Sequence, residues 1–374
     1  MADADPVGVI AEKCTRCGAC RNGCAFLKQY GLPGDAAATE LAGEPSGVDP
    51  FACSLCDLCA AMCPEKLFPA GLFLEMRRRA IAENRGRLAP YRRLRTYEWM
   101  GNSRLFSYYG LPDQCRTVFF PGCAMSGARP ETTWRMYRQI AERRPNLGIV
   151  MDCCIKPSHD LGDDGRFSAR FGRVMDRLSR GGVDEIITAC PGCFDMFRKY
   201  SGKLSVQSVW EVMPPPRVAA VPGTSHPRVR VHDPCTARFL PRLHERIRTH
   251  VAGLRLEIIE TPQSGRLAAC CGEGGAVSHA FPHMADAWRQ SAAGRSGGDP
   301  VVTYCIGCTG YLAAAGMKTV FLGDLLANPA STEMALCGSA GTTWKFPGWT
   351  YLNRIRLKRR FCRFIQALSN IQAN

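Results

Sequence analysis

Ten of the 21 cysteines in this 374-residue chain form one five-cysteine pattern that occurs twice. Each copy consists of a single cysteine, a vicinal Cys–Cys pair and a Cys-x2-Cys pair. The two copies are Cys123, Cys153, Cys154, Cys190 and Cys193, and Cys235, Cys270, Cys271, Cys305 and Cys308. Five thiols brought from three places in a fold exceed the needs of a tetrahedral zinc site. Thiolates in this number favour iron–sulfur chemistry.

Two shorter cysteine runs lie nearer the N-terminus. They read Cys14-x2-Cys17-x2-Cys20-x3-Cys24 and Cys53-x2-Cys56-x2-Cys59-x3-Cys63-Pro64. This is the spacing of two-cluster bacterial ferredoxins, in which the fourth cysteine of each run binds the other cluster. It assigns Cys14, Cys17, Cys20 and Cys63 to one [4Fe–4S] cubane, and Cys53, Cys56, Cys59 and Cys24 to a second. Zinc ribbons or a disulfide framework explain isolated Cys-x2-Cys pairs, but not two complete runs.

The region after Cys115 alternates between short β-branched runs and helical stretches. The strand-like runs are 117–123, 147–154, 184–190 and 206–213, then 229–235, 254–260, 300–305 and 318–326; helices are expected at 130–143, 166–180 and 193–201. Such alternation predicts parallel α/β units. Most of the repeated cysteines follow a strand, and open α/β sheets build ligand sites at the carboxyl ends of their strands. We therefore expect each copy to gather its thiols at one sheet edge.

These patterns predict an α/β fold of two Rossmann-like parallel units, preceded by a mainly α-helical ferredoxin-like domain. The expected parts are a two-cluster domain at 1–110, the first repeat at 115–223, the second at 226–328 and a basic tail at 338–374. The stretch from Ala70 to about Met100 reads as helical and arginine-rich, which indicates either a solvated face or a docking site for an acidic partner.

The tail from Thr350 to Asn374 alternates basic and apolar residues in a helical pattern. Its basic residues are Arg354, Arg356, Lys358, Arg359, Arg360 and Arg363, and its apolar ones are Leu352, Ile355, Phe361, Phe364, Ile365 and Leu368. A basic amphipathic helix suits a membrane surface or a membrane subunit. Packing onto its own domain is the alternative.

The composition sets the expected location and excludes some partners. The N-terminus has no signal-peptide pattern and no apolar run is long enough to span a bilayer, so a cytoplasmic location is expected, with peripheral contact to the inner membrane face through the tail. The formal net charge of +15 counts all cysteines as neutral. Cluster-bound thiolates lower that charge, so no nucleic acid is expected as a partner.

The two five-cysteine copies resemble the cysteine-rich CCG domain family. Their combination with the N-terminal ferredoxin-type runs resembles the catalytic subunit of heterodisulfide reductase. The resemblance implies that each five-cysteine copy holds a non-cubane [4Fe–4S] cluster and that a disulfide is cleaved between the two. The second copy keeps the family glycine as Gly272, whereas Ile155 replaces it in the first. Since isoleucine does not readily adopt positive φ, the first loop is expected to differ. Thr236 stands where relatives often carry His or Tyr.

Several residues near the motifs are candidates for proton transfer: His159, His232, His279, Lys156 and Glu273. Structural hydrogen bonding is the alternative for the histidines. Cys115, Cys337 and Cys362 fit no motif and are expected to be free thiols.

Two functions fit the sequence. In the first, electrons from a redox protein partner, such as a membrane cytochrome or flavoprotein subunit, pass through two cubanes to the non-cubane clusters, which reduce a small disulfide or oxidise thiols. In the second, the chain is a non-catalytic electron-transfer subunit of a larger membrane-associated, quinone-linked dehydrogenase.

Overall fold

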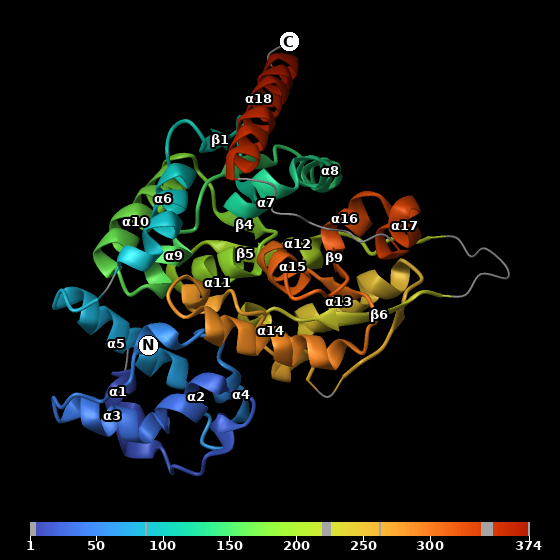
Figure 1. The fold of residues 1–374 in the computed structure, drawn as a ribbon. Coiled ribbons are helices and arrows are strands. Elements are labelled where there is room, and N and C mark those ends of the chain that lie inside the picture. Colours follow the sequence, from blue (N-terminus) through green and yellow to red (C-terminus); the bar gives the residue numbers. More distant parts are fainter. Residues whose placement is uncertain (1–4, 87, 219–225, 262, 338–346, 373–374) are drawn as a thin grey trace.

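The N-terminal part is a small helical domain that carries both ferredoxin-type runs (Figure 1, blue). The computed structural model describes residues 5–86, 88–218, 226–261, 263–337 and 347–372. The first helices are α1 (Pro6–Lys13), α2 (Ala25–Tyr30), α3 (Pro33–Leu41), α4 (Leu58–Met62) and α5 (Pro69–Ala82). Val7, Phe26 and Phe73 form its core, and Met284 and Trp288 from the second repeat join them. The domain is thus packed directly onto the C-terminal half.

The predicted helical stretch from Ala70 to Met100 is two helices. Helix α5 ends at Ala82 and α6 (Arg92–Gly101) begins ten residues later. Asn84 adopts a left-handed conformation with φ of 56° at the break. Asparagine tolerates this conformation better than most residues, and one such residue stops a right-handed helix.

The first repeat contains a five-stranded sheet with strand order β1-β3-β2-β4-β5. Its strands are β1 (Tyr108–Gly110), β2 (Thr117–Phe120), β3 (Gly148–Met151), β4 (Glu185–Thr188) and β5 (Ser205–Ser208). Strands β2 to β5 are parallel, as the sequence predicts, but β1 pairs antiparallel with β3 at the sheet edge. The prediction of a purely parallel unit is therefore wrong for this repeat. The sequence-based scheme missed β1 because a three-residue strand is too short to show periodicity.

The second repeat has a four-stranded parallel sheet with the order β7-β6-β8-β9. Its strands are β6 (Arg228–His232), β7 (Glu257–Ile258), β8 (Val301–Thr303) and β9 (Thr319–Phe321). The parallel strands have the same order in both copies. In the first, β2 lies between β3 and β4 and β5 is at the edge; in the second, β6 lies between β7 and β8 and β9 is at the edge. The duplicated sequence therefore gives a duplicated α/β sheet. The boundary between the two predicted repeats, 219–225, lies outside the described residues.

The closing segment of each repeat is a strand followed by a helix. The runs 206–213 and 318–326 were predicted as strands, but Val209–Val212 forms α12 and Leu322–Ala327 forms α16. Ser208 and Glu211 form a capping box that begins α12, and this local signal overrides the β-branched composition. The longer helices between strands are α8 (Pro130–Ala141), α10 (Asp164–Arg180), α11 (Pro191–Tyr200), α13 (Pro241–Gly253), α14 (Pro282–Ser296) and α15 (Ile306–Ala313).

The two repeats share one hydrophobic core. Trp210 of α12 is fully buried, with ring centroids 6.3 Å from Tyr304 and 5.9 Å from Phe321, both in the second repeat. Aromatic pairs at these edge-on distances stabilise beyond their buried area. This shared core fixes the two sheets relative to each other.

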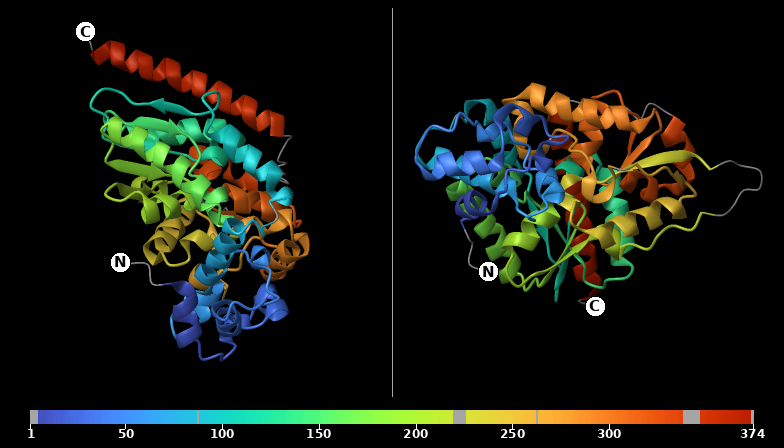
Figure 2. Two further views of the ribbon diagram at one scale, coloured as in Figure 1. Left: turned by 90° about the vertical axis from the view of Figure 1, so that its left-hand side faces the viewer. Right: turned by 90° about the horizontal axis from the view of Figure 1, so that it is seen from below.

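The C-terminal helix α18 (Pro347–Gln372) lies across the first repeat beside α7 (Cys123–Ala128) and α8 (Figures 1 and 2). Leu357, Phe361 and Ile365 are buried against that repeat. The apolar side of the predicted amphipathic helix therefore faces its own domain. Within the described residues, we find no helix with the length and apolar character needed to traverse a bilayer.

We expect Phe361→Ala to lower the free energy of unfolding by about 3–5 kcal/mol, because the ring is fully buried and packs edge-on against Tyr137. Leu352→Ala is the matched control on the same helix, since Leu352 is half exposed, and should change stability by less than about 0.5 kcal/mol. Urea denaturation measures both. Equal, small effects would contradict the packing of α18 on the first repeat.

Candidate iron–sulfur sites

The first ferredoxin-type set lies around a small hollow near the protein surface. Cys14, Cys17, Cys20 and Cys63 all line it, with Ile10 and Leu67. Cys17 is exposed. Burial and the charges of the three other thiols raise the pKa of Cys20 to about 11. These four thiols are the set that the spacing assigns to the first cubane, and the exposed Cys17 places this set at the protein surface.

The second set is buried where the helical domain meets the second repeat. Cys24, Cys53, Cys56 and Cys59 belong to the same buried cluster. Burial and the neighbouring thiols raise the pKa of Cys24 to about 12 and that of Cys59 well above its usual value. The Leu55 N–H donates to the Cys53 sulfur at 3.4 Å. Iron displaces such protons when it binds, so grouped, buried thiols of this kind fit a cluster.

The backbone of the two runs matches at the positions that turn the chain around its sulfurs. Arg16 and Gly18 flank Cys17, with φ of 56° and 77°, and Leu55 and Asp57 flank Cys56, with φ of 48° and 56°. Three non-glycine residues in the left-handed region are costly, by about 1–3 kcal/mol each, and such strain gathers at functional sites. Matched strain in both runs supports one role for both loops.

Most of the repeated cysteines follow a strand, although Cys270 and Cys271 come well after the end of β7, and the structure brings each copy's five thiols together. In the first copy Cys123 Sγ lies 4.0 Å from Cys153 Sγ, and the neighbouring thiols of Cys154 and Cys190 raise the pKa of Cys193. In the second copy the equivalent contacts recur, Cys235 with Cys270 and Cys308 with both Cys271 and Cys305. The two five-cysteine sets thus have the same internal arrangement.

The vicinal pairs are followed by a left-handed residue in both copies. Gly272 has φ of 93°, and Ile155, fully buried, has φ of 59°. Ile155 thus adopts the positive φ that isoleucine does not readily take, but the two loops differ beyond it, because α9 (Lys156–Asp160) begins directly after Ile155. A β-branched residue in this region is a genuine outlier, and burial of its side chain helps to offset the cost.

Lys156 and Glu273 occupy equivalent positions, two residues after each vicinal pair. Each lies over the glycine of its own Cys-x-Gly-Cys motif: Lys156 Cδ is 3.3 Å from where a Cβ on Gly192 would stand, and the Glu273 carboxylate would overlap a Cβ on Gly307. Only glycine permits these approaches. The Lys156 ammonium also donates to Asp160 Oδ1 at 2.8 Å.

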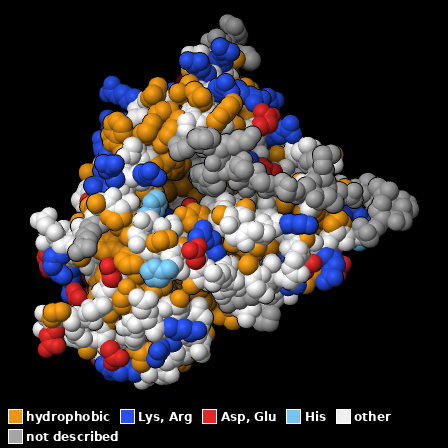
Figure 3. Space-filling model, viewed as in Figure 1, with side chains coloured by type: hydrophobic (Ala, Val, Ile, Leu, Met, Phe, Trp, Pro, Cys, Tyr) orange, Lys and Arg blue, Asp and Glu red, His pale blue; other side chains and the backbone are white. Residues whose placement is uncertain are grey.

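The two five-cysteine sets face each other across these residues. The charges of Cys190 and Cys123, from the first copy, act on Glu273, and that of Cys190 also acts on Cys305. The Glu273 residue is exposed to solvent at the surface, but protein atoms surround its carboxyl group. This burial and the charges of the nearby thiols raise the pKa of Glu273 to about 8. Figure 3 shows a hollow with hydrophobic side chains on the face viewed in Figure 1.

The second ferredoxin-type set contacts the second five-cysteine set directly. The Cys270 thiol lies next to the Cys56 sulfur and lowers the pKa of Cys56. The glycines after Cys271 make this approach possible, because Gly275 leaves no room for a side chain beside the Cys53 carbonyl. The four sets therefore lie in one order: first cubane set, second cubane set, second repeat, first repeat.

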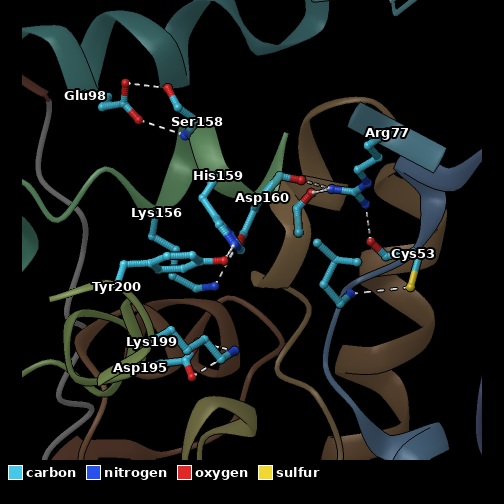
Figure 4. Close-up of polar contacts among 12 residues, drawn as sticks. Cys53, Arg77, Glu98, Lys156, Ser158, His159, Asp160, Asp195, Lys199 and Tyr200 are labelled. Carbon is cyan, nitrogen blue, oxygen red and sulfur yellow. Dashed lines mark hydrogen bonds and ion pairs between the residues drawn. The ribbon is translucent and has the colours of Figure 1, made fainter. Parts of the chain in front are cut away.

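Two buried arginines hold this junction together. Arg77 donates to four backbone carbonyls, among them those of Cys53 and Asp160 (Figure 4). These are Cys53 and Asp160, each at 2.5 Å, Gly275 at 2.9 Å and Pro50 at 3.0 Å. Arg238 donates to the Cys56 carbonyl at 2.9 Å. Neither forms an ion pair with any carboxylate of the described residues. Buried cations without a carboxylate fit a site whose anion is a cysteine-ligated cluster.

The other candidate residues have less direct roles. Both ring nitrogens of His159 are engaged, by Asp160 and Tyr200, which supports the structural alternative (Figure 4). The charge of Cys271 acts on His232, which lies near the second set. His279 packs near Tyr91. Cys115 and Cys362 are free thiols, and the side chain of Cys337 lies outside the described residues.

Neither a disulfide nor a site for a single metal ion is formed by the described side chains. Among the described side chains, no disulfide is formed. Within the same part of the chain, no group of three or more His, Cys, Asp or Glu residues is arranged to hold a single metal ion.

Comparison with known families agrees with the arrangement of the thiols. Residues 10–67 match the 4Fe-4S dicluster domain, and residues 117–198 and 229–313 each match the cysteine-rich CCG domain. The chain is an iron–sulfur protein with tandem CCG domains. This combination of domains is found in heterodisulfide reductase subunits.

Two relatives of this CCG-domain protein are themselves described as iron–sulfur proteins. A probable membrane-anchored ferredoxin of Chromohalobacter salexigens is 27% identical over 189 residues, which is 44% of this chain and 28% of the relative. An uncharacterized iron–sulfur protein of Methanococcus maripaludis is 23% identical over 305 residues, 72% of this chain and 59% of the relative. The chain thus spans less than two thirds of either relative.

Sequence reasoning missed the buried arginines, although a signal was present. Arg77 follows Leu72, Phe73 and Met76 on the buried side of α5. An arginine on an apolar helical stripe marks a buried charge rather than a solvated face. The interpretation of the arginine-rich stretch as solvated or partner-facing is therefore wrong for Arg77.

Proposed function

We propose that this CCG-domain protein passes electrons through its two cubane sites to paired non-cubane sites that reduce a small disulfide or oxidise thiols. The eight ferredoxin-type cysteines would hold the cubanes, and the ten repeated cysteines would hold two non-cubane [4Fe–4S] clusters. Clusters supply one-electron chemistry and a metal that can bind sulfur. The chain supplies the thiols, their order and the enclosed space between the repeats.

The observation that carries this proposal is the contact between Cys56 and Cys270. It joins the buried ferredoxin-type set to the second repeat, while the exposed Cys17 leaves the other set open to a redox protein partner. An electron carrier needs such an order, with one end accessible and the other enclosed. A storage or structural role for the metal gives no reason for it.

The duplicated, facing sets support a disulfide as the substrate. Cleavage of a disulfide consumes two electrons and two protons and releases two thiols, so each sulfur needs a place during the reaction. Two equivalent thiol sets with Lys156 and Glu273 between them provide one place for each sulfur. The electrons come from the protein partner and the protons from solvent in the hollow.

A relay subunit is the second candidate function, because one relative is described as a membrane-anchored ferredoxin. In that case both five-cysteine sets would carry electrons onward to another subunit. A membrane partner is compatible with α18, where Trp349 and Leu352 stay half exposed beside basic residues. Contact with the inner membrane face through this helix is part of the proposal.

Anaerobically reconstituted protein separates the two functions. The proposal expects a new paramagnetic signal when the oxidised protein meets 2-mercaptoethanol, and reduction of 2-hydroxyethyl disulfide with reduced methyl viologen. Cys154→Ala and Cys271→Ala should each abolish the reduction, whereas Cys115→Ala, which removes a buried thiol outside the sets, should not. Redox titration without a thiol-dependent signal would favour the relay.

A further inference from the structure

One arginine of the C-terminal helix is buried rather than solvated. Arg354 is 1% exposed and lies on the same stripe of α18 as Leu357 and Phe361. Its Nη2 donates to the Gly101 carbonyl at the end of α6, at 3.1 Å. Arg354 of the helix predicted to lie at a membrane surface is therefore buried inside the protein.

The guanidinium lies over the Phe106 ring, 5.9 Å from its centroid, but two of its nitrogens have no hydrogen-bond partner among the described residues. Nε and Nη1 are buried, and neither has a hydrogen-bond partner among the described residues. Arg354 also forms no ion pair with any carboxylate in that part of the chain. An unpaired buried cation costs several kcal/mol, so an anion is expected at this place.

The unpartnered nitrogens lie beside the first five-cysteine set. A Cβ built on Gly101 would stand 3.4 Å from both Arg354 Nη1 and Cys153 Cβ, so the guanidinium and this cysteine approach the same point. The charge of Arg354 also acts on Cys123, and the Tyr97 hydroxyl lies close enough to lower the pKa of this thiol. Tyr97 and Arg354 therefore cover this set from α6 and α18.

Helix α18 is fixed against the element that carries Cys123. Asn353 Nδ2 donates to the Gly127 carbonyl of α7 at 3.0 Å, and Thr350 packs so closely on Gly127 that a Cβ there would be 3.1 Å away. Since Cys123 is the first residue of α7, these contacts set the position of Arg354 relative to the thiols. Figure 1 shows α7 beside the lower end of α18.

We propose that Arg354 binds anionic sulfur at the first five-cysteine set, so that the C-terminal helix completes this site. The inference rests on the proposed function, because it takes the set to hold a cluster. A guanidinium is weakly hydrated and offers several donors in one plane, which suits a large anion in a dry site. The sulfur belongs either to the bound cluster or to a thiol that reaches it, and Arg354 acts as a positioning residue for both.

The test compares Arg354→Gln, Arg354→Lys and Arg359→Gln in the full chain after anaerobic reconstitution. Arg359 is exposed on the same helix and is the matched control. We expect Arg354→Gln to move the potential of the first-set signal downward, or to lose that set's iron, while both cubane signals keep their potentials. Arg354→Lys should keep most of the wild-type potential and iron content of the first set, because lysine retains the positive charge. Arg359→Gln should match the wild type.

A second arm separates the two sources of sulfur. If Arg354 also holds an incoming thiol, 2-mercaptoethanol should bind Arg354→Gln about 10- to 100-fold more weakly. If it holds only the cluster, the potential shifts and thiol affinity does not. Wild-type signals with an unchanged potential, iron content and thiol affinity in Arg354→Gln would overturn the inference. Absence of any first-set signal in the wild type would instead overturn the proposed function.

Discussion

Replacing Arg77 with methionine is expected to lower the free energy of unfolding by at least about 3 kcal/mol. The side chain is fully buried and donates to carbonyls of the helical domain and of both repeats. Methionine fills much of the space but leaves these carbonyls without a donor, and each unsatisfied buried group costs about 1–3 kcal/mol. The junction between the three parts should loosen first.

Arg79→Met is the control for this prediction. Arg79 lies two residues later on α5, is partly exposed and pairs with surface carboxylates, among them Glu40 and Glu75. Exposed ion pairs contribute little, so a loss below about 1 kcal/mol is expected. Urea denaturation under anaerobic conditions measures both variants. Equal losses would show that the carbonyl contacts of Arg77 do not hold the three parts together.

Removing the Cys56 thiol should interrupt electron transfer from the ferredoxin-type domain to the repeats. In Cys56→Ala, disulfide reduction driven by a reduced ferredoxin is expected to fall to the level of the apoprotein. The physical reason is that Cys56 belongs to the set that touches Cys270, whereas a protein donor is too large to reach the enclosed sets. The rate of disulfide reduction with ferredoxin as the sole donor is the measurement.

The choice of donor provides the internal control. Reduced methyl viologen is small enough to enter the hollow, so Cys56→Ala should keep a larger share of its rate with viologen than with ferredoxin. Cys115→Ala should keep both rates, because the Cys115 thiol donates a hydrogen bond to the Thr117 carbonyl and belongs to none of the four sets. Full ferredoxin-driven activity in Cys56→Ala would remove this set from the electron path.

Much of the α/β architecture is predictable from the sequence because each signal is local. The runs 117–123 and 184–190 contain β2 and β4, the stretch 130–143 contains α8, and the stretch 166–180 covers all of α10 except its first two residues. The short edge strand β1 and the strand-to-helix changes at Val209 and Leu322 escape such reasoning, since three or four residues carry too little periodicity. Boundaries depend on caps and packing rather than composition.

The order of the four thiol sets could not be predicted in this way. Spacing groups cysteines within a run, but the contact of Cys56 with Cys270 depends on how the helical domain packs on the second repeat. The roles of Arg77, Arg238 and Arg354 are likewise tertiary. Charge counting treats every arginine as solvated, whereas these three are among the most deeply buried side chains of the described residues.

We expect the cysteine thiolates to hold four iron–sulfur clusters, two of them in the repeats. Iron and acid-labile sulfide analysis of protein purified and reconstituted without oxygen tests it most directly. We expect about sixteen irons per chain, four for each cluster. About eight irons, or zinc bound at the repeated cysteines, would contradict a redox role for the CCG domains.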